Sequence, residues 1–319
     1  MKIKIFNIAA IAVLAVACGQ KKAEQFQALP FPDVLPPAMM EDPQDRAEFL
    51  AVNMWNSILD PARDYPSDSL LVSGVRRGDV EQKFVNWLQV LDMSSQKTVS
   101  KAVAGLYEKA YICERKDSTS NVFETFTELV ELYLYDPNSP YRNEDIYGMY
   151  AGRLATSEAV SAPMQEKYAR DAGLCALNRV GTRATDFRFA DRRGKMYTLY
   201  GVKAPYTLLF FSNPGCEACM NIINVLKGEP HIAQMIASGQ LAVLNIYIDE
   251  DLEAWRSYMP IYPEEWYNGF DPDFVIRNET LYNVRAIPSL YLLDADKTVI
   301  LKDAPENKIF DYLVRMQQF

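Results

Sequence analysis

Residues 210–219 have the sequence Phe-Phe-Ser-Asn-Pro-Gly-Cys-Glu-Ala-Cys, so Cys216 and Cys219 follow closely on an apolar run that begins at Tyr206. A continuous apolar run of this length is typical of a strand buried on both faces. A helix is predicted after it, over residues 220–226. At a helix start, free backbone N–H groups and the helix dipole favour a thiolate at Cys216. Cys219 lies one turn later on the same face, where the two sulfurs can form a disulfide with little backbone movement.

The rest of the C-terminal half alternates strands and helices. Residues 186–189 and 196–199 flank a turn that contains Gly194, which predicts a hairpin. Residues 241–248 form a second apolar run. Residues 290–293 and 298–301 predict a closing hairpin, and residues 306–316 predict a final helix. This order predicts an α/β domain over residues 181–319.

Residues 181–319 resemble the thioredoxin-like proteins of the type that assists cytochrome c maturation and periplasmic thiol reduction. The matching stretches are residues 210–219, Ala184-Thr185-Asp186-Phe187 and Val284-Arg285-Ala286-Ile287-Pro288-Ser289. The resemblance implies a thioredoxin-like fold, with a central mixed sheet flanked by helices. It also implies thiol–disulfide oxidoreductase activity, with Cys216 attacking and Cys219 resolving the mixed disulfide.

The same resemblance assigns a supporting role to Ile287 and Pro288. In the family the corresponding X–Pro bond is cis and lies against the disulfide, and cis bonds are almost confined to proline. The backbone of Ile287 is then expected to pair with an extended substrate segment.

The sequence departs from the family at the positions that usually carry an acid–base group. Phe210 stands where thioredoxins commonly have a buried Asp, and Ile222 stands where the cytochrome-maturation relatives often have Glu. Gly215 replaces the usual Trp. Glu217 is then the nearest carboxylate in sequence, and its charge is expected to raise the pKa of Cys216. That would favour the disulfide form and make the pair a reductant. The alternative is that Glu217 is exposed and without effect.

No metal or organic cofactor is expected beside the redox-active disulfide. A zinc site built on Cys216 and Cys219 would need two further Cys or His ligands at suitable spacing. The sequence has no second C-x-x-C motif, and its only histidine, His231, follows Pro230 at a predicted helix start. We interpret His231 as a surface or packing residue. No flavin or nicotinamide site is visible.

Residues 40–178 predict an all-α domain of unknown function. Apolar residues recur at helical spacing through the whole region, over residues 42–59, 78–91, 94–114, 120–135, 145–160 and 164–180. This region resembles a helical domain found ahead of thioredoxin-like modules in lipoproteins of the Bacteroides group. Cys113 and Cys175 lie in it and either form a structural disulfide or stay as buried thiols. In the C-terminal half, the aromatic-rich residues 255–270 predict a packing insertion or a substrate-facing lid.

Residues 1–17 predict a lipoprotein signal peptide. Lys2 and Lys4 precede an apolar run that is too short to span a bilayer, and small residues precede Cys18. Cys18 is the predicted lipidation site, and residues 18–39 are polar and Pro-rich, as a tether would be. Ordinary secretion with a free Cys18 and a short membrane anchor are the alternatives. Export would place the protein in the cell envelope, facing the periplasm, and Gly19 favours the outer membrane.

The expected partners are protein thiols or disulfides, a membrane electron donor that re-reduces the pair, and the lipid membrane. The net charge of −9 argues against nucleic acid as a partner. Two other functions remain open. The protein could bind a partner or glycan, with the redox pair as a regulator. A peroxiredoxin-like peroxidase would need Thr three residues before Cys216, where this sequence has Asn213.

Overall fold

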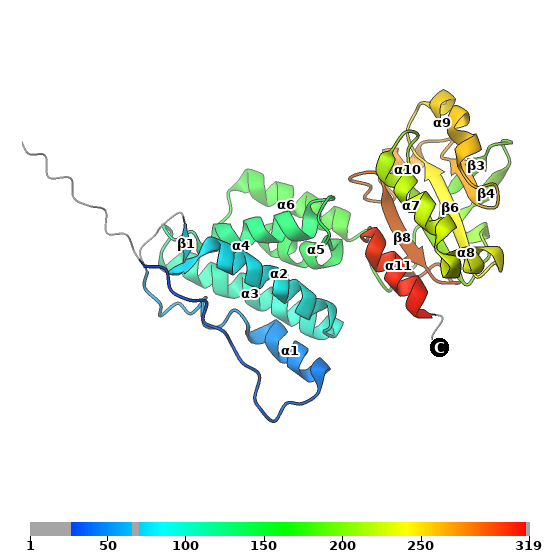
Figure 1. Ribbon diagram of the computed structural model, residues 1–319. Helices are drawn as coiled ribbons and strands as arrows, with labels where there is room; N and C mark the ends of the chain where they lie inside the picture. Colours follow the sequence, from blue (N-terminus) through cyan, green and yellow to red (C-terminus); the bar gives the residue numbers. More distant parts are fainter. Residues whose placement is uncertain (1–26, 66–69, 317–319) are drawn as a thin grey trace, which may run out of the picture.

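The computed structural model describes residues 27–65 and 70–316, which form two lobes lying side by side (Figure 1). We call residues 43–175 the helical lobe and residues 184–315 the sheet lobe. Each lobe has its own hydrophobic core. The predicted signal peptide and Cys18 lie outside the described residues. Within the described ranges, no helix is both long and apolar enough to cross a membrane.

The helical lobe consists mainly of antiparallel and crossing helices, as the periodicity predicts. Its helices are α1 (Pro43–Asn53), α2 (Arg77–Asp92), α3 (Gln96–Lys116), α4 (Val122–Val130), α5 (Glu144–Leu154) and α6 (Ala162–Cys175), and a π-helical turn (Glu131–Tyr135) continues α4. A feature that the sequence pattern did not predict is a short hairpin, β1 (Leu71–Val72) and β2 (Val75–Arg76), ahead of α2.

Polar side chains set several of the helix ends. Asp42, Ser95 and Asn143 each accept hydrogen bonds from backbone N–H groups in the first turn of α1, α3 and α5. Helix α1 ends at Asn53, before the predicted end at residue 59. The Asn53 side chain donates to the carbonyl of Phe49 (2.8 Å), and this bond competes with the regular helical pattern.

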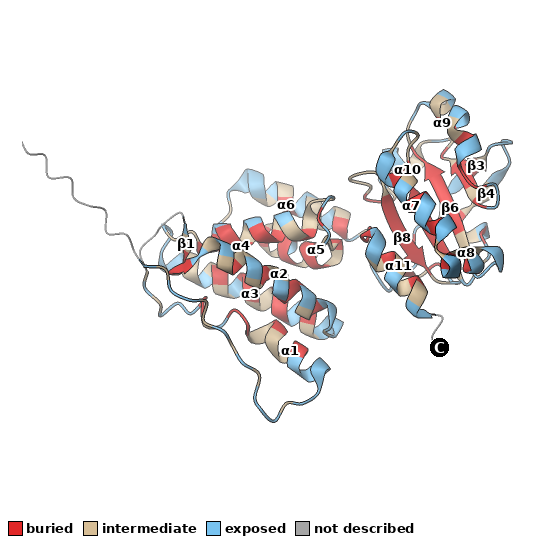
Figure 2. Ribbon diagram, in the orientation of Figure 1, coloured by how far each residue is buried: buried red, intermediate tan, exposed pale blue. Residues whose placement is uncertain are grey.

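Buried aromatic rings form the centre of the helical lobe. Trp55 contacts Phe84, Trp87 and Phe126, with ring centroids 4.9–6.2 Å apart. The indole N–H of Trp87 donates to the carbonyl of Ala51 (2.8 Å), so its polar atom has a partner inside the core. Figure 2 shows the buried faces of α2, α3 and α5 turned toward one another. These aromatic side chains, which belong to the apolar pattern at helical spacing, are therefore core residues.

Part of the predicted tether is attached to the helical lobe. The backbone N–H of Leu29 donates to the carbonyl of Gly74 (2.9 Å). The ring of Phe31 packs edge-on against Trp55, with centroids 6.0 Å apart. The segment that precedes α1 thus contributes to the edge of the helical core.

The sheet lobe contains a central mixed sheet with helices on its outside, which confirms the predicted thioredoxin-like architecture. Its strands are β3 (Arg188–Asp191), β4 (Met196–Thr198), β5 (Tyr206–Phe211), β6 (Leu241–Tyr247), β7 (Tyr267–Phe270), β8 (Ser289–Leu293) and β9 (Val299–Leu301). Its helices are α7 (Glu217–Gly228), α8 (Pro230–Ala237), α9 (Leu252–Tyr258), α10 (Val275–Asn278) and α11 (Glu306–Arg315).

Among the described residues, the seven strands pair in the order β4-β3-β7-β6-β5-β8-β9. Strand β5 is central: it is parallel to β6 and antiparallel to β8. Leu208 and Phe210 point into the cluster under α7, α8 and α11, whereas Leu209 and Phe211 point into the cluster on the opposite face. This two-sided burial explains why the strand is apolar at successive positions.

The aromatic-rich residues 255–270 are part of the packed fold. Trp255 and Trp266 are buried in the cluster beneath α7. Residues 267–270 form β7, which pairs with β6 and β3 and so is a regular strand of the central sheet, not an insertion. A Cβ at Gly269 would lie 2.5 Å from the ring of Phe189, so the close approach of β3 requires glycine at this position.

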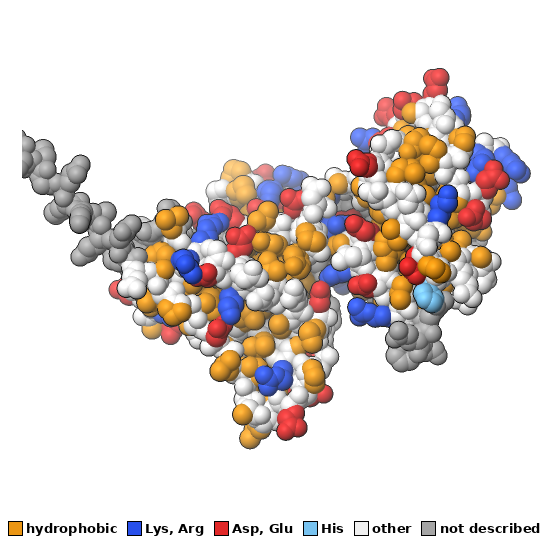
Figure 3. Space-filling view, in the orientation of Figure 1, with side chains coloured by type: hydrophobic (Ala, Val, Ile, Leu, Met, Phe, Trp, Pro, Cys, Tyr) orange, Lys and Arg blue, Asp and Glu red, His pale blue; other side chains and the backbone are white. Residues whose placement is uncertain are grey.

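The two lobes meet along α5, α6 and the β8–β9 side of the sheet. Arg142 donates to the carbonyls of Asp303 and Ala304 (2.9 Å each), and Lys308 pairs with Asp92 across the junction (2.8 Å). Figure 3 shows the molecular surface narrowing between the two lobes at this junction. Side chains from both lobes therefore hold them together.

We expect Trp87→Ala to destabilise the helical lobe by about 3–5 kcal/mol, because it removes a fully buried ring from the core. The measurement is urea denaturation followed by far-ultraviolet circular dichroism. Met93→Ala is the control: Met93 is 53% exposed, and its truncation is expected to change stability by less than about 0.5 kcal/mol. Equal effects of the two substitutions would contradict the assignment of Trp87 to the core.

Candidate active site

The two cysteines of the motif lie at the start of α7, which follows β5 in the chain. Strand β5 ends at Phe211, and residues 212–215 turn the chain before α7 begins at Glu217. Gly215 has a φ of +74°, a left-handed conformation that L side chains rarely adopt. Glycine adopts this conformation without the steric cost that a Trp side chain would add.

Cys216 is the N-cap of α7. Its Sγ accepts a hydrogen bond from the backbone N–H of Cys219 (3.1 Å). Cys216 and Cys219 form a disulfide, with their Cα atoms 5.2 Å apart. Cys216 is half-buried, whereas Cys219 is only 2% exposed and packs among the core residues. The two sulfurs therefore differ in access, and the more accessible one belongs to the cysteine to which the resemblance assigns the attacking role.

Both positions that usually carry an acid–base carboxylate are apolar and buried in this structure. Phe210 and Ile222 lie in the hydrophobic cluster that also contains Cys219. Glu217 lies in the first turn of α7 and is exposed to solvent. The carboxylate nearest in sequence to the cysteines is thus outside the core.

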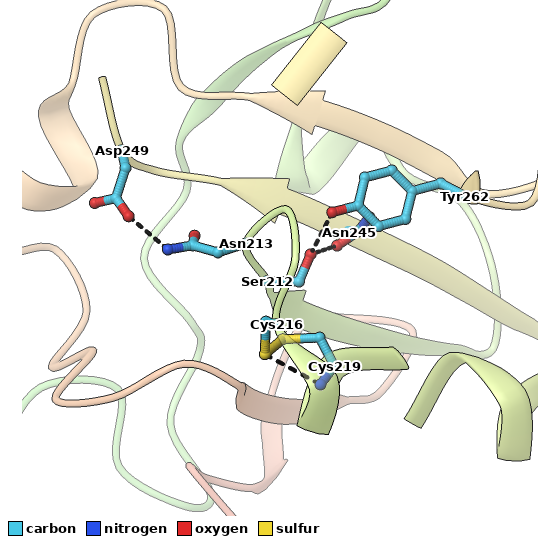
Figure 4. Close-up of a disulfide and its surroundings, with 7 residues drawn as sticks. All are labelled: Ser212, Asn213, Cys216, Cys219, Asn245, Asp249 and Tyr262. Atoms are coloured by element: carbon cyan, nitrogen blue, oxygen red, sulfur yellow. Dashed lines mark hydrogen bonds between the residues drawn. A yellow bond between two sulfur atoms is a disulfide. The ribbon is translucent and has the colours of Figure 1, made fainter. Parts of the chain in front are cut away.

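A neutral polar network lies behind the cysteine loop, as Figure 4 shows. The Ser212 hydroxyl donates to Oδ1 of Asn245 and is 3.4 Å from the Tyr262 hydroxyl. The Asn245 amide donates to Asn268 (3.1 Å), which donates to the carbonyl of Pro263 (2.7 Å). Burial raises the pKa of Tyr262, so its hydroxyl stays protonated at neutral pH.

The sequence pattern does not predict this network. Its one visible signal is Asn245, a polar residue in the middle of an otherwise apolar strand. Asn245 pairs in register with Phe210 on β5, so its amide lies next to the usual acid position. Neutral amide and hydroxyl groups therefore supply the buried polarity near the cysteines.

A second set of contacts ties the cysteine loop to its neighbours. The Asn213 amide donates to Oδ2 of Asp249 (2.6 Å), and Oδ1 of Asp249 accepts from Arg277 (2.6 Å). Figure 4 shows Asn213 pointing toward Asp249 and away from the disulfide. Asn213 thus anchors the loop to the segment after β6 and to α10.

The Ile287–Pro288 bond is cis, as the resemblance implies. Ser289, which follows it, pairs with Phe211 at the end of β5. The segment before β8 and the cysteine loop after β5 therefore meet at the same edge of the sheet. Ile287 and Cys216 pack against the same hydrophobic cluster, so the structure brings these predicted site residues together.

The remaining cysteines and the histidine lie elsewhere. Cys113 and Cys175 are free thiols, so the structure contains no disulfide between them, and the buried-thiol alternative describes them better. Burial raises the pKa of Cys113, and burial together with the charge of Glu144 raises the pKa of Cys175 to about 12. His231 is exposed near the start of α8, in agreement with its interpretation as a surface residue.

Similarity to known proteins extends over both lobes. Residues 16–177 match the family model DUF5106, described as a domain of unknown function. A thioredoxin-like protein from Bacteroides caccae is 36% identical, with a TM-score of 0.75 over 89% of this chain and 98% of that chain. The chain therefore belongs to the thioredoxin-like proteins that carry a DUF5106 domain. The match to the Bacteroides caccae structure confirms the resemblance to thioredoxin-like proteins and the fold that the sequence of this chain predicts.

Other solved structures match less than half of the present chain. The C-terminal domain of an uncharacterized protein from Bacteroides fragilis is 48% identical, with a TM-score of 0.42 over 43% of this chain and 98% of that chain. The thioredoxin domain of a thiol-disulfide oxidoreductase from Bacteroides vulgatus is 16% identical, with a TM-score of 0.38 over 43% of this chain and 97% of that chain. No curated protein matches the chain.

We expect the thiols of the reduced protein to react with iodoacetamide in a fixed order. Cys216 should react first. Cys175 should stay unmodified from pH 6 to pH 9, because its pKa of about 12 keeps it a protonated thiol throughout that range. Mass spectrometry of tryptic peptides after timed alkylation measures the order. Unfolding in guanidinium should make Cys175 reactive, and labelling of native Cys175 as fast as Cys216 would contradict the burial argument.

Proposed function

We propose that this thioredoxin-like protein is a thiol–disulfide oxidoreductase that reduces protein disulfides with the Cys216–Cys219 pair. The observation that carries the proposal is the position of Cys216 at the N-cap of α7, where its Sγ accepts the Cys219 N–H. The helix dipole and this N–H stabilise a thiolate at Cys216. The burial of Cys219 behind it supports the division into an attacking and a resolving thiol.

The proposed reaction exchanges one disulfide for another. The Cys216 thiolate attacks one sulfur of the substrate disulfide, forms a mixed disulfide and releases the other substrate sulfur as a thiolate. The Cys219 thiolate then attacks Sγ of Cys216, which closes the Cys216–Cys219 disulfide and releases the second substrate thiolate. Two electrons pass from the pair to the substrate, and the protons of the two protein thiols end on the substrate thiols.

The site binds the substrate chain beside Ile287 in this proposal. Ile287 lies at the same sheet edge as Cys216, and Pro288 next to it has no N–H to compete for backbone pairing. An extended substrate segment can pair with the backbone of Ile287 while its disulfide faces Cys216. Ile287 and Pro288 are then binding residues, and the two cysteines carry the chemistry.

The cycle needs a dithiol electron donor, since the pair ends each turnover as a disulfide. We propose that a membrane protein supplies these electrons. The signal-like residues 1–17 and the predicted lipidation of Cys18 support attachment to a membrane and a location in the cell envelope, facing the periplasm.

Glu217 is proposed to set the direction of electron flow. Its charge lies in the first turn of α7, next to Cys216, and disfavours the thiolate. Because the reduced form carries that thiolate, Glu217 stabilises the disulfide and lowers the reduction potential. A low potential suits a reductant.

Cys219→Ser should trap substrates on Cys216 as stable mixed disulfides, because no second thiol is present to release them. Cys216→Ser is the matched control and should trap none. Both variants should lose reduction of a protein disulfide such as that of insulin. Non-reducing electrophoresis followed by mass spectrometry detects the adducts. Adducts in neither variant, together with an inactive wild type, would refute the proposed function.

Glu217→Gln should raise the reduction potential of the pair by roughly 10–30 mV, since removal of the charge favours the dithiol form. Equilibration with glutathione buffers, read out by alkylation, measures the potential. Glu229→Gln, at the other end of α7, is the control and should leave the potential unchanged. A potential that is identical in Glu217→Gln and wild type would assign Glu217 no role.

A further inference from the structure

Buried charges from both lobes meet beside the Ile287–Pro288 segment. Glu144, the first residue of α5, has a side chain that is 1% exposed. Its Oε1 accepts from the Asn283 amide (2.6 Å) and from Nε of Arg285 (2.8 Å). Its Oε2 lies 3.0 Å from the ammonium of Lys302. One carboxylate of the helical lobe thus contacts three side chains of the sheet lobe.

A second carboxylate continues these contacts toward Pro288. Asp303 accepts from Nη2 of Arg285 (2.9 Å) and from the hydroxyl of Ser289 (2.8 Å). The guanidinium of Arg285 also lies over the ring of Tyr135, 4.3 Å from its centroid. Arg285 therefore bridges Glu144 and Asp303, and these bonds hold residues on both sides of the Ile287–Pro288 bond.

The charges in this cluster compensate one another. Burial acts to lower the pKa of Arg285, but Glu144 and Asp303 outweigh it, so its pKa lies above the ordinary value and the group stays charged. Lys302 completes its contacts by donating to the carbonyls of Cys175 and Leu177 (2.7 Å each), which lie at the end of α6. Loss of one member would leave a buried charge without its partner.

The segment that Glu144 contacts lies outside the regular secondary structure, and its apolar residues Val284 and Ile287 pack against the core of the sheet lobe. Residues 283–288 belong to no helix or strand. They lead directly into Ser289, which pairs with Phe211 at the edge where the cysteine loop begins. Because the sheet pairing starts only at Ser289, the position of the preceding residues depends on side-chain contacts.

The helical lobe also lines a groove beside this segment. Leu174 of α6 shares a cavity of about 380 Å³ with Asp249, Arg277 and residues 282–287. Asp249 is the residue that anchors Asn213 of the cysteine loop. The groove therefore lies between the helical lobe and the residue that anchors the cysteine loop.

We propose that Glu144 is a positioning residue for substrate docking: it holds residues 283–288 in place so that Ile287 presents its backbone next to Cys216. This assignment rests on the proposed function, and it gives the helical lobe a role in protein-substrate binding. Glu144 does not touch the sulfurs, so the intrinsic reactivity of the cysteine pair does not depend on it.

The test uses Glu144→Gln in the full chain, because Gln keeps the shape but offers an amide N–H₂ to groups that are already donors. The KM for a protein disulfide should rise about tenfold, the factor that corresponds to one lost charge-assisted hydrogen bond. The rate of the reduced protein with a small aromatic disulfide, and the reduction potential of the pair, should not change.

Two further variants separate positioning from general damage. Asn283→Ala removes one donor to Glu144 without leaving a buried charge, and it should raise the KM in the same direction if Glu144→Gln fails to fold. Asp92→Asn is the matched control. It breaks the Lys308 ion pair, which also crosses the lobes but does not contact residues 283–288, and it should leave every readout at the wild-type value.

Hydrogen–deuterium exchange provides a readout that needs no substrate. The amides of residues 283–287 should exchange faster in Glu144→Gln and Asn283→Ala, while those of β8 and β5 should be unchanged. Unchanged exchange and KM in both variants would overturn the proposal, as would an equal loss of activity toward protein and small disulfides. If wild-type protein reduces no protein disulfide, the proposed function fails, and the exchange result alone decides whether Glu144 holds the segment.

Discussion

Strand β5 pairs through its backbone with β6 on one side and with β8 on the other, and this pairing determines where the functional segments meet. The register places Phe211 opposite Ser289, so the chain that leaves β5 and the chain that enters β8 lie at one edge of the sheet. Helix α7 starts there, and Cys216 caps it. The two-sided burial of β5 makes this register stable, because a shift by one residue would exchange the side chains of its two faces. The chemistry of the site therefore depends on the apolar core of the sheet.

The site and the lobe junction use polar groups in opposite ways. Behind the cysteines, the buried polar groups are neutral: a serine, two asparagines and a tyrosine satisfy one another. At the junction the buried groups are charged, with Glu144 and Asp303 balanced by Arg285 and Lys302. Neutral groups leave the thiols without a buried charge at the usual acid position, whereas paired charges specify one arrangement of the two lobes.

Local sequence pattern was enough to predict much of this fold. The apolar run before Cys216, the hairpins and the final helix are consecutive in the chain, so periodicity and turn residues reveal them. Strand β7 was missed as a strand because Asn268 and Gly269 break its apolar pattern, and because its pairing with β3 joins distant residues. The contact between Glu144 and Arg285 spans 141 positions, and no spacing rule reveals such a pair. Of the site, the cysteines could be found from sequence, but the groups that surround them could not.

The junction between the lobes has a consequence for how chains of this kind can be rearranged. A sheet lobe moved onto a different helical partner would bring Lys302 to the new boundary without Glu144, whereas Arg285 would keep its ion pair with Asp303. Such a hybrid gene would encode an unpaired buried charge unless the incoming helix began with an acidic residue at the place of Glu144. Glu144 and Lys302 therefore form a compatibility requirement between two otherwise separate cores, and recombination between related genes would have to exchange them together.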